Sequence, residues 1–246
     1  AARGCRGEYL WIFGNDDRWV PSGFAQVLED IRAAPADVLL FEKSRIGLDG
    51  RPLPDREGNA PIKLDPGQAH RFDRLVDVGT YNGVNSSLGW ISQVVMRRKP
   101  FMAVDPEPYL GLTMYPQLAM MLQAFGDRPL FYRNHRAALH RSPTAPQRLA
   151  ELLGRREATF WQVGRVQRAR WFGASYAALL QRVVDHSGLE TTDFANHVER
   201  LWTKQPLVDW VESNWREGLA DGLELPGEWL SDARRFFAIL GRTPPE

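Results

Sequence analysis

An apolar run that ends in an acidic turn constrains this chain more than any other feature. Residues 8–13, "EYLWIF", suit a strand buried on both faces, and Gly14 ends the run. The turn that follows, Asn15-Asp16-Asp17, brings two adjacent carboxylates to the carboxyl end of that strand. Adjacent carboxylates repel each other unless a cation or hydrogen-bond donors offset their charge. The turn therefore either binds a cation or is an Asx turn that caps the next helix.

A hard divalent cation is the partner that this turn suits best. Mg²⁺ and Mn²⁺ take oxygen ligands and commonly link carboxylates to a substrate diphosphate. We expect Asp16 and Asp17 to hold the metal. Asn15, the neutral member of the triplet, would supply a carbonyl oxygen or a contact to a donor sugar.

The order of elements indicates an α/β domain followed by helices. Helical spacing over 21–34 and an apolar run over 36–46 complete a βαβ unit with the first strand. Residues 47–70, rich in Gly, Pro and Asp, predict a loop or an irregular hairpin. Further along, the patterns predict strands at 89–101 and 128–134, a helix at 115–125, and a strand or helix at 72–79. We predict an α/β domain over 1–140, a helical region over 141–240 and a disordered tail over 241–246.

Composition excludes several classes of protein. Net charge is +1, so nothing in the overall charge favours nucleic acid as a partner. Cys5 is the single cysteine, which rules out an intrachain disulfide and a cysteine-based zinc site. No apolar run approaches the ~20 residues that a membrane span needs. We expect a cytoplasmic location, with peripheral contact to the inner face of the plasma membrane left open.

The string "GEYLWIFGNDDRWVPSG" at 7–23 resembles the metal-binding segment of family 2 glycosyltransferases of the GT-A fold. The Gly-Glu-Tyr, the strand, the acidic triplet and the following proline fall in register with that segment. "WISQVVMRRKPF" at 90–101 and "YLGLTMYPQLAMMLQAFGDRPLFYRN" at 109–134 resemble the abequosyltransferase-like branch. The resemblance covers about residues 3–135 and implies a partial GT-A-like mixed sheet flanked by helices.

The resemblance implies an enzyme of the hexosyltransferase type, which acts in bacterial surface-polysaccharide synthesis such as O-antigen assembly. Three departures from the family stand out. Asn15 replaces the first aspartate of the triplet. We expect the family's opening nucleotide-binding section to lie outside this sequence. No Glu-Asp pair precedes the helix at 115–125. We therefore choose Asp105 as the catalytic base and Glu107 as the second candidate, although both also suit a Pro-flanked surface turn.

Other candidates surround these carboxylates in the predicted order of elements. For the donor we expect contacts from Trp19, by stacking, and from Arg97, His135 and Arg136 at strand ends. For the acceptor we expect Tyr115. Each also has an ordinary interpretation: a core aromatic ring for Trp19 and Tyr115, and a solvent-facing basic group for the others.

The sequence thus predicts transfer of a sugar, with inversion, from a nucleotide-sugar donor to a saccharide or lipid-linked acceptor. One rival is a catalytically inactive fragment that acts as a carbohydrate-binding or assembly module. Another is a metal-independent carbohydrate-binding protein whose carboxylates hydrogen-bond to sugar hydroxyls. The identity of the sugar, the nucleotide and the acceptor stays open, as does a homo-oligomeric state.

Overall fold

Six strands form one mixed sheet in the order β1-β5-β3-β6-β2, and β4 also pairs with β6. A computed structural model describes residues 4–14, 17–33, 35–47, 49–53, 64–65, 67–113, 115–141, 165–199 and 205–246. The strands are β1 (Tyr9–Trp11), β2 (Arg18–Trp19), β3 (Val38–Ile46), β4 (Ala69–Phe72), β5 (Val94–Arg97) and β6 (Leu130–Arg141).

The centre of the sheet is the parallel pair β3 and β6. Every residue of β3 has a partner on β6, and the register shifts on both sides of Glu42. Such a bulge bends the strands and adds to the twist of the sheet. β1 and β3 are both antiparallel to β5, so they run in the same direction with β5 between them. β4 pairs with the start of β6, at residues 130–133. β2 pairs with β6 near its end, at Ala138 and Leu139.

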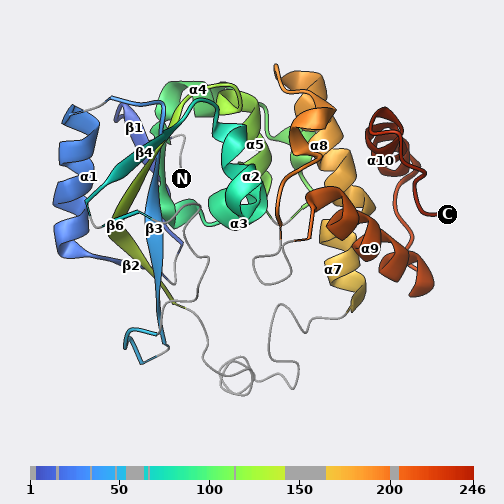
Figure 1. The fold of residues 1–246 in the computed structure, drawn as a ribbon, viewed down its shortest axis with the longest axis horizontal. Coiled ribbons are helices and arrows are strands. Elements are labelled where there is room, and N and C mark those ends of the chain that lie inside the picture. The colour runs from blue at the N-terminus through green and yellow to red at the C-terminus, as the bar shows by residue number, and fades with distance from the viewer. Residues whose placement is uncertain are drawn as a thin grey trace.

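Alternating burial on the strands produces two apolar faces. On β3, Val38 and Leu40 belong to the larger core cluster, while Leu39 and Phe41 belong to a smaller one. This period of two follows from strand geometry. The smaller cluster lies against α1 (Pro21–Ala33), which covers one face of the sheet (Figure 1).

Helices cover the other face of the sheet in successive layers (Figure 1). The first layer holds α2 (Gly79–Asn82), α3 (Val84–Leu88), α4 (Arg98–Ala103) and α5 (Pro116–Phe125). Beyond it lie α7 (Arg165–Phe172), α8 (Ala174–His186), α9 (Leu207–Ala220) and α10 (Gly227–Ile239). Short 3₁₀ turns complete the chain: η2 (Leu75–Val78), η3 (Ile91–Gln93), η4 (Glu107–Tyr109) and η5 (Thr191–Phe194).

A single apolar cluster joins the sheet to the helices. It includes Leu130 and Tyr132 of β6, Leu122 of α5, Leu179 of α8 and Trp210 of α9. Burying one such side chain contributes roughly 1.5–3 kcal/mol. The helical layers and the sheet therefore share one core. The division at residues 140 and 240 stays a prediction.

The mixed α/β class and the helical C-terminal part are confirmed. The helix expected at 21–34, the strand expected at 36–46 and the helix expected at 115–125 correspond to α1, β3 and α5. The strand predicted for 89–101 is wrong at both ends, because only Val94–Arg97 is extended and Arg98 begins α4. β6 continues seven residues beyond the strand predicted for 128–134. The predicted loop at 47–70 runs into β4, which begins at Ala69.

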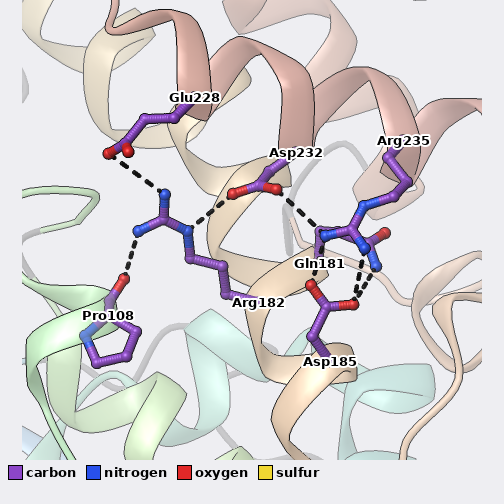
Figure 2. A network of polar contacts seen from close by, with 7 residues as sticks. All are labelled: Pro108, Gln181, Arg182, Asp185, Glu228, Asp232 and Arg235. Atoms are coloured by element: carbon purple, nitrogen blue, oxygen red, sulfur yellow. Dashed lines mark hydrogen bonds and ion pairs between the residues drawn. The ribbon is translucent and has the colours of Figure 1, made fainter.

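An ionic network fastens α8 to α10 and to the turn before α5 (Figure 2). The Nη1 of Arg182 donates to the carbonyl oxygen of Pro108 over 2.8 Å, and its Nε donates to Asp232 over 2.8 Å. Asp185 pairs with Arg235, which also contacts Asp232. Because the side chains of Arg182 and Asp232 are largely buried, this contact is more costly to break than a surface ion pair.

A short segment from the helical part, His197–Glu199, crosses α2 and α3, and we call it the strap. The amide of Val198 donates to the carbonyl oxygen of Gly79 over 3.0 Å. Gly83 has a φ of +75°, and a Cβ there would lie 2.0 Å from the carbonyl oxygen of Val198. Both the backbone angle and the close approach of the strap require glycine at this position.

We predict that Gly83→Ala destabilises the fold by more than about 4 kcal/mol, because it adds a backbone clash to backbone strain. Gly222 is the matched control: its φ is +72°, but nothing lies within 4 Å of a Cβ at that position. Gly222→Ala should cost about 1–2 kcal/mol. Chemical denaturation of both variants measures the difference, and equal losses would contradict close packing of the strap.

We predict that Arg182→Met lowers the free energy of unfolding by about 1–3 kcal/mol, since it removes the donor to the Pro108 carbonyl and leaves Asp232 with Arg235 alone. The control is Arg216→Met, which removes an exposed pair with Glu212 one helical turn away. That change should cost about 0.3–0.5 kcal/mol. Urea titration followed by circular dichroism checks both values; a loss at Arg182 no larger than at Arg216 would show that the network adds no stability.

Candidate functional site

The described ends of the acidic turn, Gly14 and Asp17, lie beside η3 and the end of β6 respectively. The amide of Gly14 donates to Oγ of Ser92 over 2.8 Å, and Nε1 of Trp11 donates to the carbonyl oxygen of Ser92 over 2.8 Å. The amide of Asp17 donates to the carbonyl oxygen of Gly14 over 3.2 Å. These bonds fix Gly14 against η3 and hold Asp17 to Gly14. Asn15 and Asp16 lie outside the described residues.

Aromatic rings close the turn from the α1 side. Phe13 precedes the turn and Trp19 follows it, and their rings stack at 4.2 Å with planes 5° apart. Trp11 and Phe24 of α1 both make edge-to-face contacts with Trp19. Their ring centroids lie 4.8 Å and 5.4 Å from that of Trp19. Such ring contacts contribute about 0.5–1.5 kcal/mol each beyond their buried area. The pair Phe13 and Trp19 thus holds the two ends of the turn together.

Asp17 and His140 meet at the end of β6. β2 is antiparallel to β6 and Arg18 lies opposite Leu139. Asp17, one residue before Arg18, therefore lies next to His140, one residue after Leu139. Nδ1 of His140 lies 2.9 Å from Oδ1 of Asp17, and the Asp17 side chain is only 6% exposed. The edge of Trp90 contacts the His140 ring. A buried carboxylate needs such a donor, because an unpaired charge would be costly here.

His140 is the residue that the sequence reasoning missed. The pattern predicts a strand that ends at 134, which would place the basic groups His135 and Arg136 at its end. The strand in fact ends at Arg141, and its carboxyl end therefore presents His140 and Arg141. The signal was present in "AALHR", which continues the strand without a Gly or Pro to stop it.

His135 and Arg136 lie in the middle of β6 rather than at its end. Nδ1 of His135 is 3.6 Å from Asp30 of α1, whose other oxygen lies 3.3 Å from Nε of Arg133. Burial lowers the pKa of His135. Five strand residues, or about 16 Å, separate His135 from His140. The structure does not bring these two residues to Asp17, and their donor role stays a prediction.

Arg97 lies at the opposite end of the sheet. It pairs with Tyr9 at the start of β1, where its guanidinium lies 4.8 Å from the ring centroid of that residue and pairs with Glu8. Asp105 and Glu107 follow α4, which begins where β5 ends, so they also belong to the end away from the acidic turn. Oδ1 of Asp105 accepts the amide of Glu107 over 3.1 Å, as in a surface Asx turn. This location gives no support to either as a catalytic base, and the assignment stays a prediction.

Tyr115 and Trp19 do lie at the same end as Asp17. Tyr115 precedes α5, whose Gln117 donates to the carbonyl oxygen of Gly89 over 3.4 Å, next to Trp90. Burial raises the pKa of Tyr115. Trp19 is 49% exposed, so part of its surface is free to meet a ligand. No contact to a sugar tests either assignment, and both stay predictions.

Two further observations bear on the class of site. Within the described ranges, which leave out Asp16, no three His, Cys, Asp or Glu side chains gather as metal ligands. A metal site here would therefore need Asp16 in addition to Asp17 and His140.

No helix in the described part of the chain combines the length and the apolar character required to cross a membrane.

Comparison with known proteins finds a weak similarity in fold to solved structures and no match in sequence. No family model matches the chain, and no curated protein matches it. The chain is similar to the solved structure of S. aureus TarS 1–349, with a TM-score of 0.41, 11% identity, and coverage of 95% of this chain and 50% of that one. The same TarS fragment in complex with UDP gives a TM-score of 0.44, 13% identity, and coverage of 97% and 60%. The chain spans between half and three fifths of those chains, and a likeness this weak supports no conclusion about activity.

We predict energetic coupling between Asp17 and His140 of at least about 1 kcal/mol, because each is the other's buried partner. The measurement is a double-mutant cycle with Asp17→Ala, His140→Ala and the double variant, followed by chemical denaturation. Additive losses, within about 0.5 kcal/mol, would contradict the contact.

Proposed function

We propose that this chain is a metal-assisted glycosyltransferase, which moves a sugar with inversion from a nucleotide-sugar donor to a saccharide or lipid-linked acceptor. The observation that carries the proposal is the buried carboxylate of Asp17, held 2.9 Å from His140 at the carboxyl end of the sheet. Open α/β sheets bind ligands at that edge. The segment 7–23, which resembles the metal-binding segment of family 2 glycosyltransferases, lies at the same place.

The residues at this edge fit a divalent metal. Asp17 offers carboxylate oxygens, His140 offers an imidazole nitrogen, and Asp16 adds a second carboxylate next to Asp17 in the sequence. Carboxylate oxygens suit Mg²⁺ and Mn²⁺ alike, whereas an imidazole favours Mn²⁺ over the harder Mg²⁺. When bound, the metal would neutralise the charge that develops on the departing diphosphate.

The protein's own groups have separate tasks in this proposal. Asp17 and His140 would hold the metal, and Ser92 fixes the Gly14 end of the turn that carries Asp17. The exposed ring of Trp19 would stack on the donor sugar or base, and Tyr115 would border the acceptor. Arg18 and Arg141 lie at the same end of the sheet and pair with no carboxylate of the described residues, so either guanidinium could reach a phosphate.

The proposed reaction also needs a catalytic base. Inversion requires a group that takes the proton of the acceptor hydroxyl during in-line attack. Asp105 and Glu107 were chosen for that task, yet they lie beyond α4 at the other end of the sheet. Their position favours the second candidate function, an inactive glycosyltransferase-like module that binds carbohydrate or supports assembly.

The setting follows from the sequence resemblance alone. We propose a role in bacterial surface-polysaccharide synthesis at the cytoplasmic face of the membrane, within the abequosyltransferase-like branch. The helical part, α7 to α10, would contact the acceptor, a partner chain or the membrane surface.

We predict that one of UDP, GDP, CDP and dTDP binds in a metal-dependent manner. Isothermal titration calorimetry with each nucleotide, with and without Mn²⁺, measures this directly. Asp17→Asn keeps the shape of the side chain but removes its charge, so metal-dependent binding should weaken at least tenfold, or about 1.4 kcal/mol. Asp49→Asn, an exposed carboxylate on the loop after β3, should bind as the unaltered chain does.

The outcomes separate the two candidate functions. Metal-dependent binding that Asp17→Asn abolishes supports the transferase. Sugar binding that ignores both Mn²⁺ and Asp17→Asn would favour a carbohydrate-binding module instead. Metal-dependent nucleotide binding that is unchanged in Asp17→Asn would overturn the assignment of the site.

A further inference from the structure

The strap, His197–Glu199, connects the helical part to the element that borders the candidate metal site. Oε1 of Glu199 accepts the amide of Asn85 over 3.4 Å, and its carbonyl oxygen accepts the hydroxyl of Ser86 over 3.0 Å. On its other side, the strap is held by Leu207, whose amide donates to His197 over 2.6 Å, and by Gln205. The strap is thus fixed between α3 and the start of α9.

A continuous series of contacts runs from α3 to Asp17. The amide of Gly89 donates to the carbonyl oxygen of Asn85 over 2.9 Å, which ends α3 directly before Trp90. The edge of Trp90 lies against His140, and His140 contacts Asp17. Through these steps, the position of α3 decides where Trp90 meets the candidate metal ligands.

The carboxyl group of Glu199 is the unusual member of this series. The residue is only 5% exposed, and its Oε2 has no hydrogen-bond partner. The groups that face it are the backbone amides of Val84 and Asn85 from α3 and the hydroxyl of Tyr176 from α8. His197, on the strap itself, turns toward Gly79 and the Arg74, Asp77 and Asp193 side chains. No basic side chain of the described residues is placed to offset a charge on Glu199.

We propose that the strap positions the candidate metal site, and that protonated Glu199 docks the strap on α3 while ionised Glu199 releases it. Release would allow α3 to shift, and the contact of Trp90 with His140 would change with it. This inference rests on the proposed function, because it assigns a regulator to the same site. Glu199 touches neither metal nor nucleotide, so it is a positioning residue.

The direction of titration agrees with the geometry. Burial raises the pKa of Glu199 to about 8 from 4.5. Because the released carboxyl has a pKa of 4.5, docking weakens progressively as the pH rises from about 4.5 to about 8 and is weakest above that range. Burial also lowers the pKa of His197 to about 4, so His197 opposes folding only below about pH 6.5, outside the pH range of the test below.

The test compares the unaltered chain with Glu199→Gln, which has the shape of the protonated side chain and cannot ionise. Calorimetry under anaerobic conditions measures the affinity for nucleoside diphosphate and Mn²⁺ at pH 7 and pH 8.5. We expect affinity to fall severalfold, at most about eightfold, in the unaltered chain as docking weakens between these pH values, and to stay level in Glu199→Gln. Glu199→Leu is a second variant that cannot ionise, and Glu29→Gln, an exposed carboxylate on α1, is the control that should behave as the unaltered chain does.

An equal fall in the unaltered chain and in Glu199→Gln would overturn the proposal. Hydrogen exchange of residues 84–92 gives a readout that needs no nucleotide, so the failure of the proposed function can be told apart. At both pH values these amides should exchange faster in the unaltered chain than in Glu199→Gln, and the difference should be larger at pH 8.5. Identical exchange at both pH values would overturn the strap as a positioning element even if nucleotide binds.

Discussion

The structure depends on the burial of one strand of the sheet, β6, between α1 on one face and the layers of helices on the other. Leu130 and Tyr132 lie under α5 and α8, while Ala137 packs against α1 on the other face. Because β6 pairs with β3 along its length and also with β4 and β2, neither end can move independently. An apolar core therefore fixes the polar end of the same strand.

That constraint produces the candidate site. The register of β6 with β2 decides that His140 faces Asp17, and a slip of one residue would turn His140 to the opposite face of the sheet. The stacked rings of Phe13 and Trp19 and the bonds to Ser92 hold the turn from its other sides. The strap then connects the site to the helical part through α3. A site built this way is prepared in advance for a ligand, which lowers the entropy lost on binding.

Sequence patterns predicted the secondary structure correctly where one local pattern decides it. Helical spacing predicted α1 and α5, and the apolar run over 36–46 predicted β3. These patterns were insufficient where packing overrides the local pattern: Arg98 begins a helix although a β-branched run precedes it, and β6 continues past Asn134 because β2 and β3 extend it. His140 was missed for that reason. The location of Asp105 depends on the direction of β5, which no short motif reveals.

The central claim is that Asp17 and His140 lie beside a bound divalent metal, and paramagnetic broadening tests it most directly. The ¹H–¹³C resonances of the five histidine side chains would be recorded while Mn²⁺ is added with UDP. We predict that the His140 signal broadens first, at Mn²⁺ concentrations that leave His186 at the end of α8 unaffected. Equal broadening of His140 and His186, or none at His140, would contradict a metal site at the acidic turn.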